Sequence, residues 1–232
     1  MTYRAVRPAR FLARPNRFLA LVELEGKEET VHVKNTGRCR ELLLPDRTVY
    51  LEESRNPNRK TRFDLIAVDK DGLLINMDAQ APNQVFSEWA RAGHFREDLT
   101  LLRPETTWGS SRFDFYWEDS HGRRGFVEVK GCTLEEQGLA MFPDAPTLRG
   151  VRHLRELARA QQEGYLNTVC IVLQMKGCHL FCPNERTHPE FGQALREAAQ
   201  AGVQVLAVDC RATPDRLEID EHVPVSLVMR EP

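Results

Sequence analysis

The sequence lacks several features that would place it in a membrane or secreted class. No apolar run approaches the roughly 18 residues that a membrane span needs. The arginine-rich start has no apolar stretch of the length, at least about 7 residues, that a secretory signal requires. The six cysteines contain no Cys-x-x-Cys pair, which fits unpaired thiols in a reducing compartment. We therefore expect a cytoplasmic protein without a membrane partner.

Common catalytic and DNA-reading motifs are missing as well. There is no serine or cysteine nucleophile pattern and no glycine-rich phosphate loop. Cys178, His179, Cys182 and His188 make a poor zinc site, because the Cys-x₃-Cys spacing is not followed by a second strong pair. No recognition helix of the helix-turn-helix type is evident, so any DNA binding should have weak or no sequence preference.

Charge is distributed unevenly along the 232 residues. The first 62 residues carry a net charge of +6, whereas the remaining 170 carry −8. Arginine supplies 26 of the 32 basic side chains, and arginine is the cation best suited to bidentate phosphate contacts. A solvated arginine-rich surface would give the same composition. The alternative is that the first part of the chain approaches a polyanion such as DNA.

The first third of the chain has the pattern of short β-strands separated by turns. Strands are expected at residues 18–24, 30–33, 48–52, 63–68 and 73–77. The last two flank Asp69-Lys70-Asp71-Gly72, which is a strong hairpin signal. About five short strands in some 60 residues predict a five-stranded OB-fold β-barrel, a fold that accepts oligonucleotides or oligosaccharides.

The pattern changes to that of an α/β layer after residue 81. Helices are expected at residues 84–95, 147–162 and 189–201, and strands at residues 112–117, 126–130, 168–173 and 203–208. Thr147 is a suitable N-cap for the second helix. Because helices and strands alternate, we expect a two-domain α+β and α/β protein, with a barrel at residues 1–81 and an α/β domain at residues 82–232.

The chemistry is concentrated in two segments of the α/β domain. The first is Ser111-Arg112-Phe113-Asp114-Phe115, in which Asp114 should lie on the strand face opposite Phe113 and Phe115. The second is Glu128-Val129-Lys130, in which the two charged residues share a face. In an antiparallel hairpin centred on His121, Asp114 and Glu128 would lie directly opposite each other.

Two carboxylates so close repel each other unless a cation lies between them. Mg²⁺ or Mn²⁺ takes oxygen ligands and is commonly held by one or two carboxylates, so Asp114 and Glu128 are candidate metal ligands. Lys130 beside them would stabilise developing negative charge or orient a metal-bound water. This is the D…(D/E)xK arrangement of restriction-endonuclease-like phosphodiesterases. The alternative is a structural ladder of ion pairs on a half-exposed sheet face.

Candidate DNA-binding residues lie in both halves of the chain. The start of the helix at residues 147–162 combines free backbone N–H groups with basic side chains, which suits a phosphate. Arginines of the predicted barrel could contact a backbone phosphate in the same way. The candidates are Arg14, Arg17, Arg38, Arg40, Arg112, Arg149, Arg152 and His153.

Longer motifs resemble the sugar fermentation stimulation protein A family over nearly the whole chain, in the right order. They are Asn35-Thr36-Gly37-Arg38, Glu41-Leu42-Leu43, Pro82-Asn83, Ser111-Arg112-Phe113-Asp114-Phe115, residues 127–134, residues 142–147, Arg149-Gly150 and His153-Leu154-x-Glu156-Leu157. The resemblance implies an N-terminal OB-fold, a C-terminal domain similar to PD-(D/E)xK nucleases, DNA binding, and a regulatory role in sugar (maltose) metabolism.

The resemblance also implies which residues form the site. Asp114, Glu128 and Lys130 fall on the nuclease-like core positions. Glu88 resembles the acid that many such nucleases carry on their first helix, and Glu105 is its rival. We expect a DNA-binding protein with a metal-dependent nuclease-type site; the alternatives are a non-enzymatic DNA-binding regulator and a carbohydrate-binding protein. The sequence leaves the oligomeric state open, a homodimer included.

Overall fold

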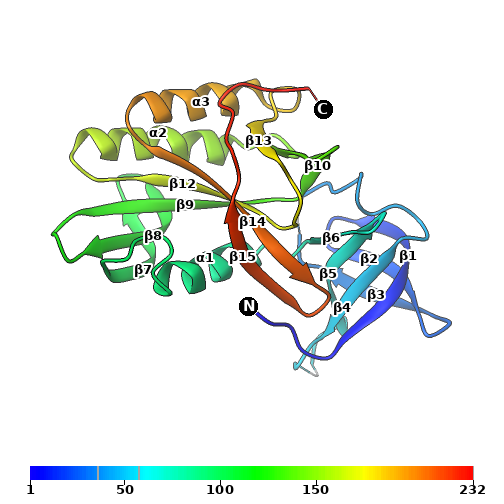
Figure 1. The fold of residues 1–232 in the computed structure, drawn as a ribbon. Helices are drawn as coiled ribbons and strands as arrows, with labels where there is room; N and C mark the ends of the chain where they lie inside the picture. Colours follow the sequence, from blue (N-terminus) through cyan, green and yellow to red (C-terminus); the bar gives the residue numbers. More distant parts are fainter. Residues whose placement is uncertain (36, 57, 232) are drawn as a thin grey trace.

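A computed structural model describes residues 1–35, 37–56 and 58–231 (Figure 1). Thr36, part of the Asn-Thr-Gly-Arg motif, therefore lies outside the described residues. The N-terminal third forms one all-β unit and the rest forms a layered α/β unit beside it (Figure 1). In the described chain no helix has the length and apolar character needed to cross a membrane.

The N-terminal unit is a barrel closed by five strands. Its sheet has the order β3-β2-β1-β4-β5-β6, and a parallel pairing of β3 with β5 joins the two sides. Apolar side chains at alternating positions, such as Ala20, Val22 and Leu24 in β2, face the interior. The strands are β1 (Val6–Asn16), β2 (Leu19–Leu24), β3 (Lys27–Val33), β4 (Thr48–Glu53), β5 (Phe63–Lys70) and β6 (Leu73–Asn76).

The barrel confirms the predicted OB-fold but uses a strand that sequence patterning missed. β1 contains two prolines and three arginines, so it lacks the clean alternation that marks a strand. It nevertheless pairs with both β2 and β4. Sequence patterning gave β6 as the fifth strand. Among the described strands β6 pairs with β5 alone, so it lies outside the closed ring.

The second unit is a six-stranded mixed sheet covered by helices on both faces (Figure 1). Its order is β15-β14-β12-β9-β8-β7, so the central strands β9 and β12 are the most deeply buried. One face packs on α1 and the other on α2 and α3. The main elements are α1 (Ala81–Arg91), β7 (Leu99–Trp108), β8 (Ser111–Asp119), β9 (Arg124–Cys132), α2 (Leu148–Gln162), β12 (Thr168–Leu173), α3 (Pro189–Gln200), β14 (Gln204–Thr213) and β15 (Arg216–His222).

A small three-stranded sheet links the second unit's helices to the barrel. It consists of β10 (Leu134–Glu136), β11 (Leu139–Phe142) and β13 (Leu180–Pro183). Lys70 of the barrel donates to both the backbone oxygen and the carboxylate of Glu135, at 2.6 and 2.5 Å. The three predicted helices and four predicted strands of this unit are present, whereas β7, β15 and the three short strands were not predicted.

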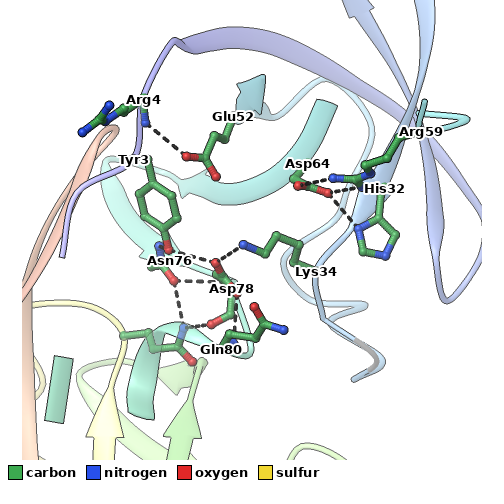
Figure 2. A network of polar contacts seen from close by, with 11 residues as sticks. Tyr3, Arg4, His32, Lys34, Glu52, Arg59, Asp64, Asn76, Asp78 and Gln80 are labelled. Atoms are coloured by element: carbon green, nitrogen blue, oxygen red, sulfur yellow. Dashed lines mark hydrogen bonds and ion pairs between the residues drawn. The ribbon is translucent and has the colours of Figure 1, made fainter. Parts of the chain in front are cut away.

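A buried polar network fixes the barrel to the second unit (Figure 2). The carboxylate of Asp78 is fully buried and accepts from Lys34 Nζ at 2.6 Å and from Tyr3 Oη at 3.3 Å. Burial raises the pKa of the Tyr3 hydroxyl above its usual range, so this group stays protonated and can donate. Gln174, at the end of β12, donates to Asn76 Oδ1 at 2.9 Å and to the backbone oxygen of Asp78 at 3.0 Å.

Candidate active site

Glu128 and Lys130 lie near the end of β9, in the centre of the second unit. Their neighbours Val127 and Val129 point into the apolar layer under α1, so the two charged side chains point toward α2. Glu128 is 2% exposed, and its Oε1 accepts a hydrogen bond from Lys130 Nζ. A carboxylate buried this deeply needs compensation for the water that it has lost.

Asp114 reaches the same region from β8. Tyr116 pairs with Phe126 and Phe115 with Val127, which confirms the hairpin register centred on His121. The next position in this register places Asp114 opposite Glu128. The ladder ends there, because Asp114 Oδ2 accepts from the backbone N–H of Val129 at 2.8 Å and Oδ1 accepts from Asn83 Nδ2 of α1 at 2.9 Å.

The strand changes face beside Asp114, which corrects the prediction that Phe113 and Phe115 share one face. Phe113 packs on Phe126 and on His153 of α2, with ring centroids 5.1 and 5.9 Å apart. Phe115 instead packs on Phe86 of α1, with centroids 5.3 Å apart. Two residues that are two apart lie on the same face of a regular strand, so β8 is irregular at Asp114. The irregularity brings Asp114, which contacts α1, next to Glu128, which contacts α2.

His153 is buried in this site and is not available to contact DNA, contrary to the prediction. It is 1% exposed, and its Nδ1 lies 2.6 Å from Glu128 Oε1. Its Nε2 accepts from Arg149 Nε at 3.3 Å. The imidazole therefore holds the Glu128 carboxylate in place, and only Arg149 and Arg152 of the predicted trio are exposed at the start of α2.

The two carboxyl groups have opposite pKa shifts. Burial, followed by the charge of Glu128, raises the pKa of Asp114. Burial alone would raise the pKa of Glu128 too, but the hydrogen bond from His153 and the charge of Lys130 outweigh it and hold that pKa below its usual range. The hairpin register places the two acids opposite each other, so the charge of Glu128 disfavours the charged form of Asp114.

The arrangement fits a divalent cation. Glu128 Oε2 is buried and has no hydrogen-bond partner among the described residues, so one carboxylate oxygen is left for another ligand. Asp114 accepts one hydrogen bond on each oxygen, and each oxygen keeps a further lone pair. Two carboxylates and water are the usual protein ligands of Mg²⁺ and Mn²⁺. The structure thus joins the predicted metal ligands Asp114 and Glu128 to Lys130.

The two candidate helix-borne acids do not join this group. Glu88 is exposed on α1, where its carboxylate accepts from the amino group of Met1 at 2.5 Å and from Gln84 at 3.0 Å. Asn83 is the α1 residue that contacts Asp114. Glu105, the rival candidate, is exposed on β7 and lies 3.6 Å from Arg112. Glu88 therefore does not lie where a third metal-binding acid was predicted.

The predicted barrel arginines surround one pocket. Arg14, Arg17, Arg38 and Arg40 all line a hollow of about 420 Å³. The guanidinium of Arg14 is used inside the protein, since it donates to the backbone oxygens of Arg17, Asn35 and Arg38 at 2.7–2.9 Å. Arg17, Arg38 and Arg40 are exposed. The fold thus brings together, from two separate loops, three cations that have no ion-pair partner among the described residues.

This pocket lies beside the loop that leads into α2. A Cβ atom at Gly37 would come within 2.6 Å of Asp144 Oδ2, so the two loops approach each other closely at this glycine. Three residues after Asp144, the Thr147 side chain caps α2 by accepting from the N–H of Gly150 at 3.1 Å, as predicted. The barrel arginines and the exposed arginines of α2 therefore belong to neighbouring parts of one surface.

A second acidic group was not predicted. In the described chain, Asp209, Asp220 and Glu221 have carboxylate oxygens close enough to share an ion. Lys176 Nζ already lies 2.6–3.0 Å from all three. The lysine supplies the positive charge, so this group is an ion-pair cluster between the β12–β13 connection and the β14–β15 hairpin.

Comparison with known families identifies the relatives of this chain. The family described as the SfsA N-terminal OB domain matches residues 12–77, and the one described as the sugar fermentation stimulation protein RE domain matches residues 80–216. The chain belongs to the sugar fermentation stimulation protein family. This confirms the resemblance seen in the sequence, and the RE domain match agrees with the predicted restriction-endonuclease-like fold.

Relatives in this family align with nearly the whole chain. A sugar fermentation stimulation protein homolog from Desulfitobacterium hafniense is 55% identical, covering 98% of this chain and 99% of its own length. A homolog from Clostridium beijerinckii is 50% identical, covering 98% and 100%. The solved structure of Pyrococcus furiosus SfsA in complex with Ca²⁺ has a TM-score of 0.88 and 28% identity, covering 97% of this chain and 98% of that one.

Sequence reasoning missed two residues that support the site. Asn83, which holds Asp114, was noted only as part of a family motif. Arg149 was predicted to bind phosphate, but it also contacts the imidazole that holds Glu128. The spacing of Arg149 and His153, four residues apart on one helix face, could have indicated their contact. Nothing in the sequence alone shows which strand residue that imidazole meets.

Proposed function

We propose that this protein binds DNA and hydrolyses phosphodiester bonds at Asp114, Glu128 and Lys130 with the help of Mg²⁺ or Mn²⁺. The observation that carries the proposal is the buried Oε2 of Glu128, which has no hydrogen-bond partner in the described part of the chain, in a carboxylate placed next to Asp114 and Lys130. In a ladder of ion pairs, which is the structural alternative, most buried carboxylate oxygens have a hydrogen-bond partner.

Different residues of the site would bind the metal, position its ligands and stabilise negative charge. Asp114 and Glu128 would hold the cation, which when bound would activate water and neutralise charge on the phosphate. Asn83 and the Val129 N–H fix Asp114, while His153 fixes Glu128. Lys130 Nζ donates a hydrogen bond to Glu128. It therefore lies close enough to the proposed metal site to stabilise negative charge that develops on a phosphate oxygen.

The DNA-binding surface that we propose is the arginine pocket of the barrel together with the start of α2. Arg17, Arg38 and Arg40 would contact phosphates on one side, and Arg149 and Arg152 on the other. The contact between Gly37 and Asp144 links the two parts. Arg112 lies near the exposed side of β8 and would extend this surface.

A cleavage assay tests the catalytic proposal. Single-stranded, duplex and branched DNA are incubated with the protein and Mg²⁺, Mn²⁺ or a chelator. Metal-dependent cleavage should vanish in Asp114→Ala and in Glu128→Gln. Glu88→Gln and Glu105→Gln are matched controls, because both acids are exposed and bonded elsewhere, and they should cleave like the parent. Cleavage that is unchanged in Asp114→Ala would point to a contaminant and overturn the proposal.

DNA binding without hydrolysis is the second candidate, and one observation favours it. Lys130 already neutralises Glu128 in the structure, and no third acid joins the pair in the described part of the chain. A protein that binds DNA but shows no metal-dependent cleavage on any substrate would match this candidate.

We keep residues 1–81 and residues 82–232 as the proposed barrel and nuclease-like domains, and the cytoplasm as the proposed location.

A further inference from the structure

Phe18 is an exposed aromatic residue at the tip of the turn between β1 and β2. Its side chain is 45% exposed, which is unusual for phenylalanine. The turn is well held, because Asn16 Oδ1 accepts the N–H groups of Phe18 and Leu19 at 2.9 and 3.0 Å. The guanidinium of Arg17 lies over the ring, 4.7 Å from its centroid. The fold therefore presents a fixed aromatic ring with a cation on one side.

Two hollows flank this turn. One is the arginine pocket, which includes Arg17 in its lining. The other, of about 280 Å³, is lined by Phe18 itself together with His32, Val33, Lys34, Ala79 and Gln80. None of the described residues that line either hollow is acidic. Lys34 is paired with Asp78, so the positive charge beside Phe18 comes from the arginine pocket. This charge suits an anionic chain more than an apolar protein partner.

Two more basic side chains lie on β3 and in the loop between β4 and β5, and both are paired with Asp64 (Figure 2). His32 Nδ1 lies 2.8 Å from Asp64 Oδ1, and Arg59 donates to both oxygens of the same carboxylate. A third hollow of about 450 Å³ is lined by Arg55, Arg59 and Arg62, and also by Glu53, whose carboxylate pairs with Arg62. The β1–β2 and β4–β5 loops are the ones with which OB-folds hold oligonucleotides.

We propose that Phe18 is a stacking platform for an unpaired base, so that the barrel of this protein binds single-stranded nucleic acid. The proposal rests on the DNA-binding part of the proposed function and names its substrate class. In a duplex, neighbouring base pairs cover both faces of each base, so a side chain can stack only on a base that has been released. Arg17, Arg38 and Arg40 would contact the phosphates that flank the stacked base.

Fluorescence anisotropy with a labelled oligothymidine and with a duplex of the same length tests the proposal. Phe18→Ala should weaken oligothymidine binding by about 10-fold or more, since stacking of one base on an aromatic ring contributes that much. Phe18→Trp, which keeps an aromatic ring, should bind oligothymidine as tightly as the parent protein does. Oligothymidine should also quench the fluorescence of the new indole. Leu44→Ala is the matched control, because Leu44 is 43% exposed on the same barrel but contributes no ring.

The outcomes separate this proposal from the broader one. Parent protein that binds DNA, with Phe18→Ala binding oligothymidine as well as the parent does, overturns the stacking platform and leaves DNA binding intact. An equal loss for duplex and single strand also overturns it, because stacking on an unpaired base cannot affect a closed duplex. If the parent protein binds neither the oligothymidine nor the duplex, both proposals are overturned. Thermal unfolding of each variant confirms that the exposed substitution leaves the fold unchanged.

Discussion

His153 Nδ1 of α2 lies 2.6 Å from Glu128 Oε1 of β9, and both side chains are buried. Arg149 Nε can only donate a hydrogen bond, so His153 Nε2 is the acceptor. The imidazole proton is therefore on Nδ1, which points at Glu128. The carboxylate is thereby oriented by the helix that follows it in the chain. Such outer contacts determine how well an acid binds metal.

His153→Ala should therefore weaken binding of Mn²⁺ by about 10- to 100-fold, because Glu128 loses the group that orients it. Isothermal titration with Mn²⁺ measures this effect without relying on activity. His121→Ala is the matched control, since His121 is exposed in the β8–β9 turn and lies outside the site. Equal Mn²⁺ affinity in His153→Ala and the parent would show that the imidazole does not support a metal ligand.

Asn83→Ala should also weaken Mn²⁺ binding, by about 10-fold, since Asp114 loses the hydrogen bond from α1. Asn83→Asp should bind Mn²⁺ more tightly than Asn83→Ala, because a third negative charge beside two acids that already repel each other attracts the cation. Titrations of the two variants in parallel check this order. The reverse order would show that repulsion from the new carboxylate moves Asp114 away from the metal.

DNA binding should fall steeply as salt is added. Arg17→Ala, Arg38→Ala and Arg40→Ala should each reduce the slope of log affinity against log salt by about 0.7 to 0.9, the share of one phosphate contact. Arg211→Ala is the control, because that guanidinium is already paired with Asp220 at 2.5 Å. Slopes that stay the same in the three barrel variants would show that their cations do not contact phosphate.

Asp78→Ala should destabilise the protein by about 3 kcal/mol, because it leaves Lys34 without its partner in a mostly buried place. Urea unfolding followed by tryptophan fluorescence measures the loss. Asp71→Ala removes an ion pair whose acid is 83% exposed and should cost less than about 1 kcal/mol. A small effect of Asp78→Ala would mean that water replaces the carboxylate in the junction between barrel and second unit.

Local patterns predicted the regular parts of the fold well. β12 begins and ends where its run of β-branched and apolar residues does, and α2 begins directly after its threonine cap. The patterns failed for β1, whose prolines and arginines hide its alternation, and for β7, whose polar residues lie at the open edge of the sheet. Both strands form because neighbouring strands supply partners for their backbones.

The sequence by itself determined the hairpin of β8 and β9, and with it the nearness of Asp114, Glu128 and Lys130. That result follows from short-range geometry, since turn position fixes which residues lie opposite each other. Only the tertiary structure decided that His153 is a buried support for Glu128, that Glu88 lies with Met1, and that Asn83 reaches Asp114. These contacts depend on how helices pack on the sheet, and packing of distant segments is set by the whole core.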